Sequence, residues 1–204
     1  MSQKEWNASL ATCTQALQIA NSQKNLSAKA HLIMTLSKIA LFTNNQDSVN
    51  QVVLELDSLM EEGSSNPSSV DVALLKMCKL TTIVIDALNH GEHKKAVPFL
   101  LQLHSLSDTQ ATSKMDDRQF CDKKARKHVL LLAYLLSGVV HMPSDNYKAQ
   151  VFMIEGLKLL EGNEVDVLQD DVDELSLVKM KALLLLYLSE VCMLRTEYKD
   201  SFEV

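Results

Sequence analysis

Apolar residues recur at intervals of three and four along almost the whole chain, and short polar segments interrupt them. In the segment 46–62, for example, Val49, Val52, Leu56 and Leu59 fall on one face of a helix. This spacing matches the 3.6-residue period of an α-helix and not the alternation of a β-strand. The pattern predicts helices over residues 8–22, 27–42, 46–62, 70–88, 92–106, 117–140, 146–160, 171–195 and 197–204.

The residues between these segments are typical of helix ends and turns. Gly63 and Gly162 each stand where a helix C-terminus favours a residue in the left-handed conformation. The segment 89–91, Asn-His-Gly, predicts a tight turn. Pro98 lies inside a helical pattern, so we expect either a kink there or a helix that begins later than residue 92.

The connections alternate in length. Very short turns follow the second, fourth, sixth and eighth predicted helices, and longer polar loops follow the third, fifth and seventh. A short turn brings two consecutive helices into antiparallel contact. We therefore expect an all-α fold, an α-solenoid formed by residues 1–204 as a single segment. Its hairpins are expected at residues 27–62, 70–106, 117–161 and 171–204.

A small or medium-sized residue stands near the start of the second helix of each hairpin. These residues, which we expect to let neighbouring helices pack closely, recur every 47 to 53 residues and are Val49, Ala96, Ala149 and Ser201. The runs around them resemble the turn and second helix of a tetratricopeptide (TPR) repeat. The period is longer than the usual 34 residues, so the units would be elongated TPR-like hairpins in a right-handed superhelix.

The composition is consistent with a helical fold, and the net charge limits the classes of partner. Aromatic residues make up 5% of the chain, and five Gly and three Pro are too few for the many tight turns of a β protein. The formal net charge of -6 argues against a chain that binds nucleic acid by neutralising phosphates. We therefore expect no direct sequence-specific contact with nucleic acid.

The cysteines and the apolar runs bear on the compartment. Cys13, Cys78, Cys121 and Cys192 stand singly in apolar helical segments, which is typical of buried thiols in a reducing compartment. The longest apolar run, 129–142, is shorter than the roughly 20 residues that span a bilayer. We expect an intracellular protein that does not enter a membrane.

A series of short motifs follows in a fixed order along the chain. They are Leu36-Ser37-Lys38, Asn66-Pro67, Lys95-Ala96-Val97-Pro98, Lys127-His128-Val129, Tyr134-Leu135, His141-Met142 and Tyr147-Lys148-Ala149-Gln150. In the order and spacing of these motifs, the chain resembles the central part of the TPR subunit of the cohesin-loading complex, the cohesin loading factor family.

The resemblance implies a function in binding and placement. Members of that family form a curved TPR superhelix around an extended N-terminal segment of a large HEAT-repeat subunit, and the pair loads cohesin onto chromatin. It implies a nuclear, chromatin-associated scaffold that supports sister chromatid cohesion, with the cytoplasm as the alternative location. A generic TPR adaptor or scaffold of another multi-subunit complex is the alternative function.

The inner face of such a superhelix is lined by the first helix of each hairpin. The candidates for partner contact on these helices are Lys38, Lys76, Lys79, Lys127, Tyr134 and Tyr187. The alternative for the lysines is a solvated helix face, and for the tyrosines it is core packing. The basic run 123–128 has the same two interpretations, a contact for an acidic partner or a solvated face balanced by nearby aspartates.

Residues for chemistry do not gather in any recognisable pattern. His90 and His93 are close in sequence, but no cysteine pair or further histidine accompanies them at the spacing of a zinc site. No Gly-rich phosphate loop or nucleophile motif is present. We assign no catalytic residue, metal or cofactor, and expect that the protein is not an enzyme.

Overall fold

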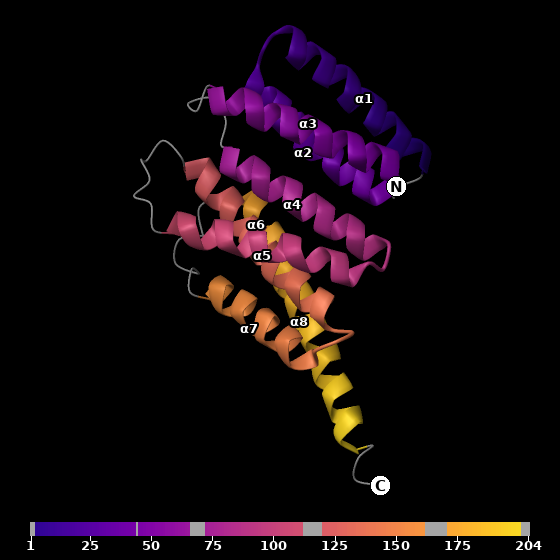
Figure 1. Cartoon of the computed structure of the whole chain (residues 1–204), viewed down its shortest axis with the longest axis vertical. Helices are drawn as coiled ribbons and strands as arrows, with labels where there is room; N and C mark the ends of the chain where they lie inside the picture. Colours follow the sequence, from indigo (N-terminus) through magenta and orange to yellow (C-terminus); the bar gives the residue numbers. More distant parts are fainter. Residues whose placement is uncertain (1–2, 44, 66–71, 112–119, 162–170, 201–204) are drawn as a thin grey trace. The chain divides into compact units, whose positions relative to one another are not determined.

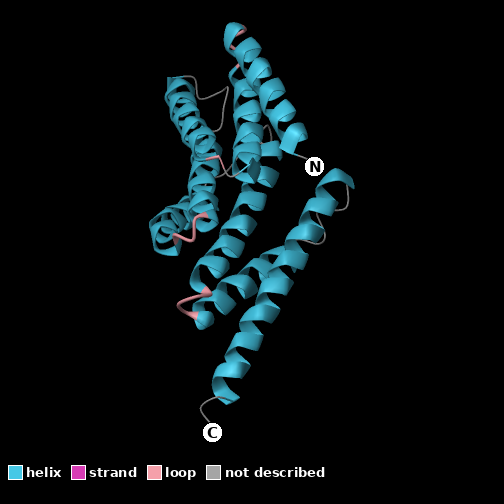
Figure 2. Cartoon of the chain, turned by 90° about the vertical axis from the view of Figure 1, so that its right-hand side faces the viewer, coloured by secondary structure: helices cyan, strands magenta, loops and turns pink. Residues whose placement is uncertain are grey.

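The computed structural model describes residues 3–43, 45–65, 72–111, 120–161 and 171–200, and these residues form helices and no strand (Figures 1 and 2). The all-α prediction is therefore confirmed. The helices are α1 (Gln3–Ser22), α2 (Leu26–Thr43), α3 (Gln46–Ser65), α4 (Val72–Asn89), α5 (His93–Ala111), α6 (Phe120–His141), α7 (Asn146–Glu161) and α8 (Asp171–Asp200).

Side chains just before three helices satisfy the first free backbone N–H groups. The Oδ1 atoms of Asn25, Asn45 and Asp145 accept hydrogen bonds at 3.0 to 3.1 Å from the backbone N–H three residues later. These are N-caps of α2, α3 and α7. The bond to Asp145, from the N–H of Lys148, favours the ionised carboxylate and holds its pKa below the usual range.

The end of α4 was predicted correctly and the end of α3 was not. Gly91 has a φ of 72°, and the N–H groups of Gly91 and Glu92 donate to the carbonyls of Leu88 and Ala87 at 2.9 and 2.8 Å, a Schellman turn. Gly63 instead lies buried inside α3, which continues to Ser65. The hydroxyl of Ser64 donates to a carbonyl four residues earlier and so supports the extra helical turn.

Further boundaries differ from the sequence prediction, among them the start of α1 at Gln3 and the end of α5 at Ala111. α5 begins at His93, one residue later than drawn from the sequence, and contains Pro98 within the helix. α8 is one continuous helix to Asp200, and the turn predicted between residues 195 and 197 does not form. Thr196 and Glu197 offer no Gly or Pro to end the helix. Gly162 and Ser201, two other predicted helix-end or packing positions, lie outside the described residues.

The chain divides into two compact units, Met1–Glu92 and His93–Val204. The predicted hairpin 70–106 crosses this division and stays a prediction. In the first unit, α2 contacts α1, α3 and α4, and α3 also contacts α4 (Figure 1). The α2–α3 pair is the hairpin that the short turn predicted. Its core is made of Leu17, Ala30, Ile33, Leu36, Ala40, Val49, Val52, Leu56, Leu59 and Leu75.

In the second unit, α6 contacts α5, α7 and α8, and α7 also contacts α8. The α6–α7 pair is again a predicted hairpin. A Cβ added at Gly156 of α7 would lie 3.2 Å from Leu184 of α8 and 3.2 Å from Tyr134 of α6. A Cβ at Gly138 of α6 would meet the Cε atom of Met153 and lie 2.8 Å from its Sδ. Glycine at these two positions therefore allows the helices to approach closely.

Candidate functional site

The sequence-predicted partner residues are divided between the two units, with Lys38, Lys76 and Lys79 in the first and Lys127, Tyr134 and Tyr187 in the second. Lys38 and Lys76 are exposed on α2 and α4 of the first unit. Lys79 is half-buried, and its Nζ lies 2.6 and 2.7 Å from the two carboxylate oxygens of Asp57, which joins α4 to α3. Lys127 belongs to α6 of the second unit, with its side chain outside the described residues.

The two tyrosine candidates are half-buried in the second unit. Tyr134 lies edge-on to the ring of His104, with ring centroids 5.1 Å apart. Tyr187 packs against the core cluster of Leu135, Met153 and Leu184. These contacts are those of the core-packing interpretation, and a contact of either tyrosine with a partner stays a prediction.

The packing candidates and the cysteines have mixed environments. Val49, Ala96 and Ala149 are buried, as a packing role requires. Cys13 and Cys78 are half-buried, but Cys192 is exposed, so the expectation that it is buried is wrong. The reason is that α8 carries apolar residues around its whole circumference, only part of which packs on other helices.

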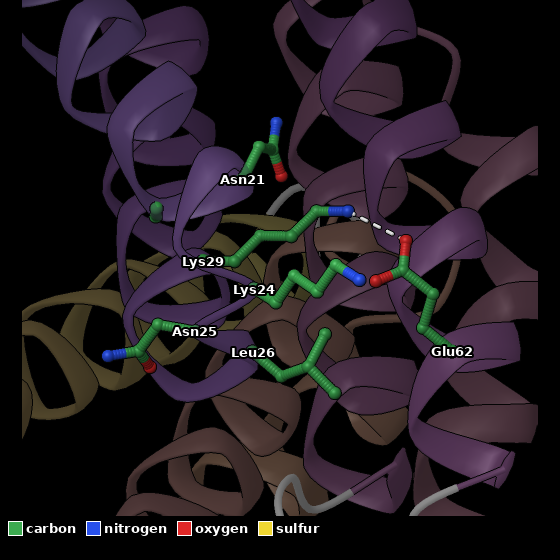
Figure 3. A pocket seen from close by; sticks show the side chains of 7 residues that line it. Asn21, Lys24, Asn25, Leu26, Lys29 and Glu62 are labelled. Atoms are coloured by element: carbon green, nitrogen blue, oxygen red, sulfur yellow. Dashed lines mark hydrogen bonds and ion pairs between the residues drawn. The ribbon is translucent and has the colours of Figure 1, made fainter.

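One pocket of the first unit combines charge, burial and open space. It has a volume of about 490 Å³. It lies where the turn between α1 and α2 faces the C-terminal part of α3 (Figure 3). Its lining residues are Ala20, Asn21, Lys24, Asn25, Leu26, Lys29 and Glu62.

The backbone of the turn positions Lys24. The N–H groups of Lys24 and Asn25 donate to the carbonyls of Asn21 and Ala20, both at 3.1 Å, as in a Schellman turn. Lys24 occupies the position that glycine usually takes, with a φ of 54°. The side chain of Lys24 extends from this turn toward Glu62 (Figure 3).

Lys29 extends into the same pocket from the first turns of α2. Its side chain is only 8% exposed, and its Nζ donates to Oε1 of Glu62 at 2.8 Å. An ammonium has three N–H donors. Among the described residues, Glu62 is the one acceptor of Lys29 Nζ, so two donors of this buried group remain for another acceptor.

Glu62 is the carboxylate that balances Lys29. The hydrogen bond from Lys29 lowers the pKa of Glu62, and the positive charge of Lys29 and the hydroxyl of Ser58 lower it further against the opposing effect of burial. Two lysines against one glutamate leave one positive charge in the pocket. With the amide of Asn21 beside them, these groups can hold a carboxylate or a similar anion.

Sequence reasoning missed this pocket, although one signal was present. Leu26, Lys29, Ile33 and Leu36 follow the spacing of one helical face, so a lysine stands on the apolar stripe of α2. A charged residue at such a position needs a partner. The partner, Glu62, is 33 residues away, and nothing in the sequence connects the two.

The described residues contain neither a membrane-spanning helix nor a metal site, and the comparisons with known proteins gave no match. Within the part of the chain that the structure describes, no helix is long and apolar enough to cross a membrane. In the same residues, no group of three His, Cys, Asp or Glu side chains could hold a metal ion. Comparison of the chain with protein-family models, with curated proteins and with solved structures gave no match.

Proposed function

We propose that the protein is a binding scaffold that holds an extended segment of another protein, and that the pocket around Lys29 receives an acidic side chain of that segment. The observation that carries the proposal is a buried ammonium, paired with one carboxylate, beside open space of about 490 Å³. An acidic side chain would accept a further hydrogen bond from this ammonium and balance the remaining positive charge.

The geometry favours a carboxylate on a flexible chain over a larger rigid anion. Lys24, Lys29 and Glu62 come from three different elements, a turn and two helices, and converge on one pocket (Figure 3). A side chain of an extended segment can enter such a space while its backbone stays at the surface. Hydrogen bonds to charged groups contribute about 1.5–3 kcal/mol each, so one such contact would change affinity by about tenfold or more.

For the architecture we propose elongated TPR-like hairpins that stack as an α-solenoid. The neighbours within each unit support this. α2 pairs with α3 and also contacts α4, and α6 pairs with α7 and also contacts α8. Stacked hairpins have this arrangement, because the first helix of one hairpin packs on its own partner and on the first helix of the next.

For the partner we propose a large HEAT-repeat subunit of a cohesin loader, through an extended N-terminal segment. The support is the ordered series of motifs between Leu36 and Gln150. On this proposal the protein acts in the nucleus as a non-enzymatic subunit, reaches cohesin and chromatin indirectly, and supports sister chromatid cohesion during cell division.

Purification of the chain with its bound proteins from a nuclear extract tests the partner. We expect a HEAT-repeat loader subunit and cohesin subunits in stoichiometric amounts. A stable complex that contains neither would contradict the loader and favour an adaptor of another assembly. Recovery of the chain without any bound protein would contradict the scaffold itself.

A matched pair of variants tests the pocket. Lys24→Gln removes one charge from an exposed side chain of the pocket, and Lys94→Gln removes one from an exposed lysine of α5. We expect Lys24→Gln to weaken the purified complex about tenfold, with a smaller effect in high salt, and Lys94→Gln to leave affinity unchanged. Equal affinities for both variants would show that the partner does not use the pocket.

A further inference from the structure

α8 carries large apolar side chains that are exposed in the described part of the chain. The exposed fractions are 57% for Val178, 41% for Leu183, 48% for Leu185, 54% for Leu186 and 57% for Met193. On the opposite face, Leu184 and Val191 are fully buried. A helix that is apolar around its whole circumference is normally buried on all sides, so the exposed face indicates an interface.

The exposed residues form a continuous stripe. Val178, Ala182, Leu185, Ser189 and Met193 follow one another at intervals of three or four, which places them on one side of the helix, and the exposed Leu186 borders them at mid-length. From Val178 to Met193 the stripe is about 22 Å long at 1.5 Å per residue. We call it the α8 stripe.

The α8 stripe is complementary to itself in the antiparallel direction. When two copies are aligned about a point between Leu185 and Leu186, each Val178 faces a Met193 and each Leu185 faces a Leu186. The small residue Ala182 then faces the small residue Ser189, so the two helices can approach closely. A two-fold axis repeats every one of these contacts, as in an isologous dimer.

The charges beside the stripe distinguish the antiparallel from the parallel alignment. Lys179 and Glu190 lie on the same edge of the α8 stripe, eleven residues or about three helical turns apart. The two-fold axis places Lys179 of one copy near Glu190 of the other, and it does so twice. A parallel two-fold alignment would instead place this edge of the two copies on opposite sides of the contact, so that Lys179 of one copy would not meet Glu190 of the other.

We propose that a second copy of this chain docks on the α8 stripe and forms an antiparallel homodimer. One helix face is smaller than the surface of about 800 Å² per partner that a standard interface buries. The dimer is therefore a reversible one. This inference does not depend on the proposed function, since the lysine pocket belongs to the first unit and the stripe to the second.

Sedimentation velocity of the full chain over a range from about 1 to about 200 µM tests the proposal. We expect the mass to rise from that of the 22.8 kDa monomer to twice that value. Leu186→Glu places a charge in the centre of the stripe and should weaken the dimer by about tenfold or more. Leu101→Glu, at an exposed leucine of α5, is the control and should leave it unchanged.

Charge exchange tests the direction of the helices and does not depend on the folding of Leu186→Glu. Lys179→Glu and Glu190→Lys should each weaken the homodimer several-fold, and an equimolar mixture of the two single variants should associate as a heterodimer. The double variant, with both changes in one chain, should associate like the parent. A monomer at every concentration would overturn the proposal. So would a dimer whose association is changed neither by Leu186→Glu nor by the charge changes.

Discussion

The two units show the same pattern of helix neighbours but hold it in different ways. In the first unit, polar pairs join helices: Lys29 to Glu62 between α2 and α3, Lys79 to Asp57 between α4 and α3, and Ser37 to Thr82 between α2 and α4. In the second unit, Gly138 and Gly156 let α6, α7 and α8 approach closely. Polar pairs fix which residues meet, whereas small residues fix how closely helices approach.

The two units also differ in the feature that each leaves accessible to a partner. The polar pairs of the first unit include a buried ammonium that one carboxylate does not saturate, so its open feature is a charged pocket. The second unit has a polar contact too, from His104 Nε2 to Ser137 Oγ at 2.9 Å, with His104 stacked on Phe152. Its open feature, however, is the apolar stripe of α8.

The largest loss of stability should come from a charge placed at a buried alanine where helices pack closely. Ala149→Arg and Ala96→Arg each place a guanidinium at a fully buried position of the second unit. We expect each to lower the free energy of unfolding by about 3–5 kcal/mol, because the charge would be buried without a partner. Urea denaturation followed by circular dichroism measures the change, and a variant that unfolds with the parent would show that its alanine is not a packing position.

A smaller steric change should lower the stability of the second unit without changing that of the first. Gly156→Val adds atoms where even a Cβ would lie 3.2 Å from Leu184 and Tyr134. Overpacking of this kind costs about 1–3 kcal/mol. Thermal unfolding should show a lower midpoint for the second unit, while hydrogen exchange of α1–α4 stays as in the parent. Faster exchange throughout both units would mean that they unfold together.

The ion pair of the first unit should depend on pH. The pKa of Glu62 is lowered in the folded protein, so its contribution to stability is complete above the ordinary value near 4.5 and is lost as pH falls through the lower folded value. Because Glu62 is 43% exposed and so screened by solvent, we expect Glu62→Gln to cost only about 1 kcal/mol at pH 7.

Urea midpoints at two pH values check this sign. The midpoint of Glu62→Gln should lie below that of the parent at neutral pH, and the two should converge in strong acid. Glu61→Gln changes an exposed carboxyl of the same helix turn and is the control. A difference between Glu62→Gln and the parent that persists unchanged in acid would contradict the ion pair as its cause.

The smallest effect should come from removing a polar pair completely. The hydroxyl of Thr82 donates to the carbonyl of Cys78, so Ser37 Oγ must donate to Thr82 Oγ1, 2.6 Å away. Ser37→Ala alone should cost about 1 kcal/mol, and Ser37→Ala with Thr82→Val should cost less than the single change. A double-mutant cycle by urea denaturation measures the coupling, and simple additivity of the two losses would contradict it.

The sequence predicted the helices well because their signals are local. The apolar spacing of Val49, Val52, Leu56 and Leu59 predicts α3 and its buried face, and the Asn-His-Gly turn at 89–91 forms as expected. The prediction that α3 ends at Gly63 was wrong because glycine permits a helix end without requiring one. Whether the chain turns there depends on the burial of Gly63 in the first unit, which the local sequence does not contain.

The candidate site could not be predicted because it depends on pairs that are distant in sequence. Lys38, Lys76 and Lys79 were selected as candidates for partner contact, but Lys79 meets Asp57, 22 residues earlier, and the pocket depends on Lys29, which meets Glu62. Helix periodicity gives the face on which a side chain lies. It does not give the residue of another helix that this face meets.

The backbone at Lys24 is left-handed, so stability favours glycine at this position whereas the proposed binding favours lysine. Glycine fits a φ of 54° without strain, whereas lysine there costs about 1 kcal/mol. Lys24→Gly should therefore raise the urea midpoint while it lowers affinity for an acidic partner, and movement of both quantities in the same direction would contradict this trade-off. A designer who optimised this chain for robustness alone would discard the residue that the proposed recognition of an acidic partner needs.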